Sequence, residues 1–169
     1  NGLSIQEAIQ KILSRILKQK ITLHGSGRTD SGVHALAQSA HFLIREKINN
    51  KLLFLNSVNY FLNKKKISIL EIKTKKKNFH ARYSAKKRFY KYLIVNRIAP
   101  LSLEVNKAWH IKSVLNIKLI KKAAKLLEGK KDFSTFRASS CGAKSPIRTL
   151  EGVMITKKEN KITIIFISK

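Results

Sequence analysis

The stretch LHGSGRTDSGVHALAQSAHF, from Leu23 to Phe42, sets one aspartate, Asp30, in a run of glycines and serines. Arg28 precedes this aspartate by two residues, and His34 follows it by four. The segments ITLHG and AQSAHFLI, at the two ends of the stretch, predict short strands, the first of them broken by a glycine. The stretch therefore predicts a strand, a loop that carries Asp30, and a second strand.

Upstream of this loop, the segment SIQEAIQKILSRILKQ has the apolar spacing of an amphipathic helix. Ser4 is a suitable N-cap, and Glu7, three residues later, completes the pattern of a capping box. A first helix is therefore predicted directly before the loop. Its apolar positions are Ile5, Ala8, Ile9, Ile12, Leu13 and Ile16.

The remaining segments alternate between the helical and the extended pattern. KLLFLNSVNYFLN predicts a second helix, and ISILEIKT alternates as a strand. KKRFYKYLIVN predicts a long strand, followed by a turn at Pro100 and a short strand around KAWHI. IKLIKKAAKLLEG predicts a helix that ends at Gly129, and RTLEGVMITKKENKITIIFISK a hairpin that turns at KKENK.

This order of elements predicts an α+β fold. Adjacent strands near both ends favour antiparallel pairing, so we expect an antiparallel or mixed sheet with helices on one face and the other face free for a ligand. A soft boundary falls near Pro100. We therefore expect residues 1–100 to form an N-terminal α/β half with the loop, and residues 101–169 to begin a C-terminal half.

The charge of the chain indicates a polyanionic partner. Lys and Arg total 36 against 9 Asp and Glu, a formal net charge of +27 over 169 residues. Nucleic acid is the first candidate, although an AT-rich genome would also enrich lysine. A single cysteine, Cys141, excludes a disulfide framework. No apolar run approaches the ~20 residues of a membrane span and no signal peptide is apparent, so we expect a cytoplasmic protein.

Several kinds of site are disfavoured by the residues around the loop. The spacing of Gly25, Gly27 and Gly32 fits a dinucleotide fingerprint poorly. The histidines His24, His34 and His41 surround the loop at irregular spacing, and histidines beside a sheet are more often packed than ligating. We therefore expect no metal site and no cofactor. The scarcity of acidic residues also argues against a pair of catalytic carboxylates.

Two interpretations of Asp30 remain open at this point. TDSG is suitable for an Asx-turn or an N-cap, in which the carboxylate only stabilises the backbone. Alternatively, Asp30 is a reactive group. A lone carboxylate repels the phosphates of a nucleic acid, and the neighbouring Arg28 would favour its ionised form. A role as nucleophile or as general base in a reaction at a sugar or a nucleobase would account for such a residue.

The loop GSGRTDSGVHA, Gly25 to Ala35, closely resembles the signature loop of the tRNA pseudouridine synthases of the TruA family. FHARYSAKKRFYKYLIVN resembles the second motif of that family, and DFSTFRASS with SPIRTL resembles its third block. SIQEAIQKIL is similar to the helix that precedes the loop. The resemblance covers nearly the whole chain in order.

The resemblance implies a pseudouridine synthase fold, with a sheet built from two ferredoxin-like halves and an RNA-binding cleft. It implies a homodimer that modifies uridines 38 to 40 of the tRNA anticodon arm and uses no cofactor or metal. Asp30 matches the catalytic aspartate, as nucleophile or as base. Arg28 matches the arginine that helps to hold the flipped-out nucleotide, and Tyr90 the tyrosine that stacks against the target uracil.

Tyr90 also has a simpler interpretation as a core residue, because aromatic residues in strands are usually packed. Alternation places Tyr90 and Tyr92 on one face of their strand and Phe89 on the other. The family's first strand, and a later segment whose arginine pairs with the catalytic aspartate, have no counterpart here, so we expect a chain truncated at both ends. An RNA-binding remnant without turnover, or a structural half that needs a complementary fragment, are therefore the alternatives to an active isomerase.

Overall fold

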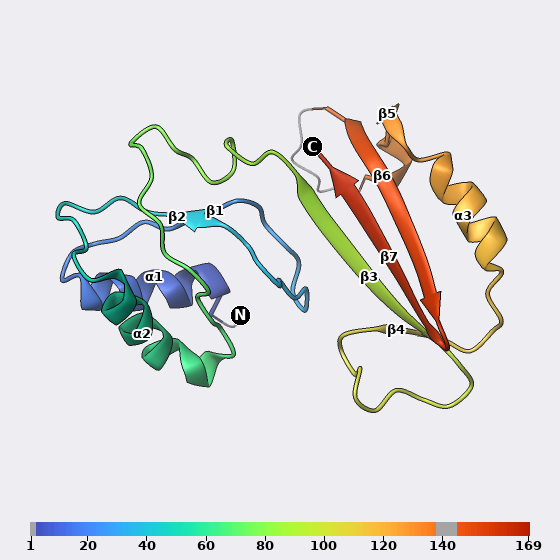
Figure 1. The fold of residues 1–169 in the computed structure, drawn as a ribbon, viewed down its shortest axis with the longest axis horizontal. Helices are drawn as coiled ribbons and strands as arrows, with labels where there is room; N and C mark the ends of the chain where they lie inside the picture. The colour runs from blue at the N-terminus through green and yellow to red at the C-terminus, as the bar shows by residue number, and fades with distance from the viewer. Residues whose placement is uncertain (1–2, 138–144) are drawn as a thin grey trace. The chain divides into compact units, whose positions relative to one another are not determined.

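The computed structural model describes residues 3–137 and 145–169. The chain divides into two compact units, Asn1–Ala85 and Lys86–Lys169 (Figure 1), and each unit is described by itself below. From the sequence, a soft boundary was expected near Pro100. In the structure the strand β3 (Arg88–Asn96) precedes that point but lies in the second unit, because it pairs along its length with β7 (Lys161–Ser168).

The first unit begins with the helix α1 (Ile5–Ile16), which confirms the first predicted helix. The Ser4 hydroxyl accepts a hydrogen bond from the Glu7 main-chain N–H at 3.1 Å, as expected of an N-cap. The Glu7 carboxylate pairs with Lys11 at 2.8 Å, one turn further along the helix. The start of α1 is therefore fixed by the cap that the sequence predicts.

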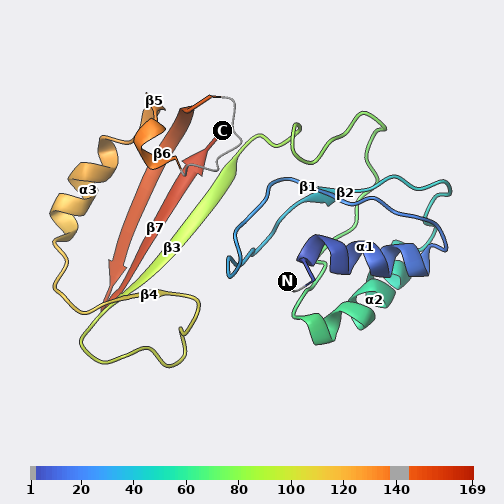
Figure 2. The same ribbon diagram turned by 180° about the vertical axis from the view of Figure 1, so that it is seen from behind.

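The second predicted helix is also present, as α2 (Lys51–Leu62), and is followed by the 3-10 turn η1 (Asn63–Lys65). Asn50 caps it by accepting from the Leu53 N–H at 2.9 Å. Figure 2 shows α1 and α2 side by side. Their apolar faces meet in one core cluster, whose buried members are Leu13, Ile21, Leu23, Phe54, Val58 and Leu62.

The prediction of a strand in ISILEIKT is wrong, because residues 67–74 join no sheet ladder in the structure. The segment is held instead by the side chain of Asn59 on α2. This amide donates to the Ile69 carbonyl at 2.9 Å and accepts from the Ile69 N–H at 2.7 Å. Ile67, Ile69 and Ile72 pack against the first core cluster. The alternating apolar residues of this segment therefore indicate that one of its sides is buried, and not that the segment pairs with a strand.

The second unit is a five-stranded sheet in the order β4-β3-β7-β6-β5. Its pairs are antiparallel except for β3 with β4, which is parallel, so the predicted mixed sheet is confirmed. The predicted hairpin is β6 with β7, and the chain turns at Glu159, whose φ is 53°. The other three strands of this sheet are β4 (Trp109–Ile111), β5 (Gly129–Asp132) and β6 (Ile147–Lys158).

One helix, α3 (Ile117–Lys125), packs on this sheet. Ala124 of α3 forms the second core cluster with Ile94, Ile155 and Ile162 of the strands. The sequence predicted a helix that ends at Gly129, but α3 already ends at Lys125. The N–H groups of residues 126, 127 and 128 bond three residues back instead of four, which tightens the last turn. Gly129, with φ of 96°, begins β5 instead.

Within residues 3–137 and 145–169, no helix is both long and apolar enough to cross a membrane. The end of the DFSTFRASS block and Cys141 lie outside the described residues. The part of that block that is described contains the 3-10 turn η2 (Ser134–Phe136).

Candidate active site

The loop that carries Asp30 is closed at its base by a short antiparallel ladder. β1 (His24–Gly25) pairs with β2 (Ala40–His41), which confirms the two strands predicted on either side of the loop. The Ser26 N–H donates to the Ser39 carbonyl at 2.8 Å, and the Gln38 amide donates to the Gly27 carbonyl at 2.9 Å. These bonds extend the closure beyond the strands and leave residues 28–37 as the loop.

Helix α1 holds the chain directly before this ladder through its polar side chains. Gln6 donates to the Leu23 carbonyl at 2.7 Å, and Gln10 accepts from the Leu23 N–H at 3.0 Å. The hydroxyl of Ser14 accepts from the Ile21 N–H at 3.0 Å. Residues 21–23 are therefore fixed by one face of a helix in place of a neighbouring strand. Leu23, only 4% exposed, anchors this entry to the loop in the core.

Asp30 begins a main-chain turn at the tip of the loop. The Val33 N–H donates to the Asp30 carbonyl at 3.3 Å, and Gly32, at the third position, has a φ of 85°. A positive φ at that position is the requirement of a type II turn and favours glycine. Among the described residues, none donates a hydrogen bond to the Asp30 carboxylate or forms an ion pair with it. The turn is therefore made without the side chain of Asp30, which is exposed.

Arg28 and Asp30 lie on the same loop, and both side chains are exposed. Within the ranges 3–137 and 145–169, no ion pair joins them. Arg28 is thus close to Asp30 in the sequence, as expected, but the two side chains form no ion pair. A cation and a carboxylate, two residues apart and both open to solvent, are available to bind a substrate from the same loop.

Three histidines lie together at the base of this loop. The rings of His24 and His41 are stacked, with centroids 5.1 Å apart and planes 22° apart. The ring of His80 lies 4.5 Å from that of His41 and 5.9 Å from that of His24. Burial, and then the nearby His80 and His24, lower the pKa of His41 below its ordinary value of 6.5. The surroundings of His41 therefore favour its neutral ring.

The sequence did not indicate that His80 belongs to this cluster, and His34 was grouped with His24 and His41 instead. His34 is exposed in the loop, whereas His80 comes from the FHARY segment, 39 residues after His41 along the chain. No local spacing could link the two positions, although the FHARY segment had been singled out as a family motif. Among the described residues, no group of three or more His, Cys, Asp or Glu side chains is arranged to hold a metal ion.

Tyr90 lies on β3 in the second unit, opposite Phe166 of β7. It is 48% exposed and is absent from the core cluster beneath α3, so it is not a core residue. Tyr92 lies opposite Ile164 on the same face, as alternation predicted, and contacts the Phe166 ring edge-on at 5.7 Å. This face also carries Ile94, which packs beneath α3. Tyr90 is thus on the helix-bearing face, and not on the helix-free face where a ligand was expected.

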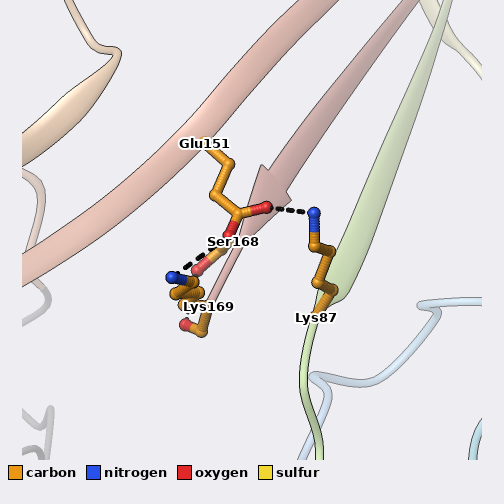
Figure 3. Close-up of polar contacts among 4 residues, drawn as sticks. All are labelled: Lys87, Glu151, Ser168 and Lys169. Carbon is orange, nitrogen blue, oxygen red and sulfur yellow. Dashed lines mark hydrogen bonds and ion pairs between the residues drawn. The ribbon is translucent and has the colours of Figure 1, made fainter.

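An ion-pair cluster fixes the start of β3, just before Tyr90 (Figure 3). Glu151 lies at an irregularity of β6, between Leu150 and Gly152. Its carboxylate accepts from Lys87 at 2.6 Å and pairs with Lys169 at 3.7 Å. The hydrogen bond from Lys87 is the main reason that the pKa of Glu151 lies below its ordinary value of 4.5. One carboxylate therefore ties the first residue before β3 to β6 and to the residue after β7.

With this geometry in place, comparison with known proteins assigns the chain to a family. A family model described as tRNA pseudouridine synthase matches residues 1–84 and 123–168. The matched residues include the whole Asp30 loop, the cluster of His24, His41 and His80, and the β6–β7 hairpin. The unmatched residues 85–122 contain Tyr90.

Individual relatives match over a larger part of the chain. The tRNA pseudouridine synthase A of Pelagibacter ubique is 55% identical over 168 residues, which are 99% of this chain and 68% of the relative. Those of Neorickettsia sennetsu and Wolbachia pipientis wMel are 45% and 44% identical, and the chain covers 63% and 65% of them. The chain thus spans about two thirds of the length of these relatives. It belongs to the tRNA pseudouridine synthase family.

Proposed function

We propose that the protein isomerises uridine to pseudouridine in tRNA, with Asp30 as its catalytic carboxylate. The observation that carries the proposal is the Asp30 side chain itself, which is exposed and has no partner among the described residues, in a turn that the main chain makes. A carboxylate that only stabilised a turn would accept a backbone N–H. The names of the relatives support the choice of tRNA as substrate.

The reaction is an isomerisation, so the product has the same atoms as the substrate. The N-glycosidic bond of the target uridine breaks, the uracil turns, and a carbon of the base bonds to the same ribose carbon; that base carbon releases its proton, and the ring nitrogen that left the ribose takes one up. Asp30 acts either as nucleophile or as base. A uracil must leave the helical stack to reach such a group. Arg28 helps to hold the flipped-out nucleotide, and Tyr90, half-exposed on β3, offers a ring on which a base can stack.

We further propose uridines 38 to 40 of the anticodon arm as the targets, a homodimer as the working assembly, and the cytoplasm as its location. The excess of 36 basic over 9 acidic residues supports binding to the phosphates of tRNA. Binding should then weaken steeply with salt, because each neutralised phosphate releases condensed counterions. A titration at 50 mM and 200 mM salt should show a loss of more than about tenfold; a flat response would contradict phosphate-dominated binding.

The test of the activity uses tRNA transcripts that carry uridine at position 38, 39 or 40 alone, with a transcript lacking all three as the matched control. Pseudouridine is mapped by mass spectrometry after incubation with the protein. We expect product in the three substrates and none in the control. Tight binding without product in any transcript would contradict the isomerase and would favour an RNA-binding protein. Product in the control would contradict the proposed positions.

A further inference from the structure

The histidine stack at the base of the Asp30 loop joins three segments of the first unit. His24 comes from β1, His41 from β2, and His80 from the segment Phe79–Ser84. The ring of Tyr83 lies 4.4 Å from His80, and the ring of Phe79 meets His41 edge-on at 6.0 Å. The segment therefore packs through its aromatic rings against the strands that close the loop.

Two hydrogen bonds in this stack depend on the protonation state of the rings. The Ala81 N–H donates to Nδ1 of His41 at 3.1 Å, and the Arg82 N–H donates to Nδ1 of His80 at 3.2 Å. A ring nitrogen accepts only when it carries no proton. Both rings must therefore be neutral, with their proton on Nε2, for the two bonds to exist.

We propose that His24, His41 and His80 form a pH-sensitive latch that holds the Phe79–Ser84 segment on the base of the Asp30 loop and thereby positions Asp30. This inference rests on the proposed isomerase function. Protonation of His41 turns Nδ1 from an acceptor into a donor that faces the donor of Ala81. Ala81 is 3% exposed, so its N–H then loses its partner away from water. The Phe79–Ser84 segment then separates from the base of the loop and no longer covers the ladder of two residue pairs there.

The nearby His80 and His24 oppose protonation of His41, and a hydrogen bond with the His24 main chain partly offsets their effect. His24 faces His41 from β1, and His80 faces it from the Phe79–Ser84 segment. Arg82 belongs to the same segment, and the ammonium of Lys75 lies 5.8 Å from the centre of the Phe79 ring. A second imidazolium in this group would repel the first.

The direction of the pH effect follows from the pKa of His41, which the fold lowers from 6.5. The unfolded chain then binds more protons than the folded one as the pH falls below 6.5, so the latch is most stable above that pH and weakens progressively below it. A loss of activity between pH 7.5 and 5.5 that disappears in variants of His41 and His80 would report the latch.

The experiment measures two quantities across pH 5.5 to 7.5 on the same protein. The first is the protection of the Ala81 and Arg82 amides against hydrogen exchange, corrected for the intrinsic rate at each pH. The second is kcat and KM for pseudouridine formation. We expect the protection of both amides to fall by up to about tenfold at pH 5.5, one unit below the ordinary pKa of a histidine in the opened latch, and kcat to fall with it, while KM is steady or lower because the added charges are positive.

Matched variants separate the latch from other effects. In His41→Asn and His80→Asn, a side-chain oxygen near the position of Nδ1 still accepts the N–H but does not titrate, so protection and kcat should lose most of their pH dependence. His41→Leu removes the acceptor and should expose the Ala81 amide at every pH. His110→Asn is the control, since His110 lies on β4 and bonds the Arg97 carbonyl in the second unit; its profile should match the parent protein.

The two hypotheses fail in distinguishable ways. If no pseudouridine forms at any pH, the isomerase proposal fails, and amide protection still tests the latch. The latch is overturned if the corrected protection of Ala81 is equal at pH 5.5 and 7.5. Its positioning role is overturned if protection falls while kcat stays constant.

Discussion

The Asp30 loop and the β3 strand hold their candidate site residues by different means. The ladder at the base of the loop contains two residue pairs, and the chain before it is fixed by the side chains of Gln6, Gln10 and Ser14. The strand that carries Tyr90 instead shares eight residue pairs with β7. A single side chain can therefore disturb the loop, whereas the strand is supported by many equivalent main-chain bonds.

This difference in support fits the roles proposed for Tyr90 and Asp30. A ring that stacks on a base needs a fixed surface, which a sheet provides. A carboxylate in a loop of few bonds can be set by a small number of contacts, and a change in any of them alters its position. Positioning errors are costly in catalysis, because reacting groups must approach each other closely. Substitutions that spare Asp30 but loosen the loop should therefore reduce turnover more than they reduce binding.

The largest effect among the supporting residues is expected at Tyr90. Tyr90→Leu removes a stacking surface worth about 1–3 kcal/mol per base, so kcat/KM should fall roughly ten- to a hundredfold. Tyr90→Phe keeps the ring and should retain most of the binding of tRNA. Tyr92→Leu is the matched control, because it removes a tyrosine from the same face of the same strand. An equal loss in Tyr90→Leu and Tyr92→Leu would indicate that Tyr90 only supports the sheet.

An intermediate effect is expected at Gln10, which tests the loop side of the comparison. Gln10→Leu leaves the N–H of buried Leu23 without its acceptor, at a cost of about 1–3 kcal/mol. Amides of residues 21–25 should exchange faster and kcat should fall about tenfold, while exchange in β3 stays unchanged. Gln10→Glu keeps an acceptor oxygen and serves as the control. Unchanged exchange before the loop in Gln10→Leu would contradict the role given to α1.

The smallest effect is expected at Glu151, on the strand side. Its lowered pKa means that its ion pairs stabilise the fold above the ordinary value of 4.5 and lose this contribution as the pH falls below it. Because Lys87 and Lys169 are exposed, the effect should be small. Glu151→Gln should lower the melting temperature by a few degrees or less at pH 7 and by less still at pH 3.5. A difference that is the same at both pH values would exclude the charge as its origin.

The residues that could be predicted from sequence are those whose signal is local. Ser4 and the apolar spacing after it located α1, and the glycines around Asp30 located the loop between two strands. Residues 67–74 alternate like a strand, yet the partner that holds Ile69 is an asparagine on a helix, and alternation does not specify a partner. His80 could not be placed beside His41, since the contact depends on how two distant segments fold together.

The prediction for Tyr90 shows the same limit within one strand. Alternation correctly grouped Tyr90 with Tyr92, because side chains of a strand alternate in any sheet. It could not tell which face α3 covers, since that depends on the packing of Ala124 against Ile94 and Ile162. The sequence therefore predicted that Tyr90 and Tyr92 share a face of the sheet, and the structure shows that α3 packs on that face.

The central claim is that the Asp30 carboxylate is present for chemistry and not for the turn. Asp30→Asn tests it most directly, with pseudouridine formation, tRNA binding and thermal melting measured side by side. The main-chain turn through Gly32 does not use the carboxylate, so the melting temperature should not change. Binding should be equal or tighter with one negative charge fewer, and product should fall by at least about 10²- to 10⁴-fold. Product at the level of the parent protein would contradict the claim and would place the reactive group elsewhere.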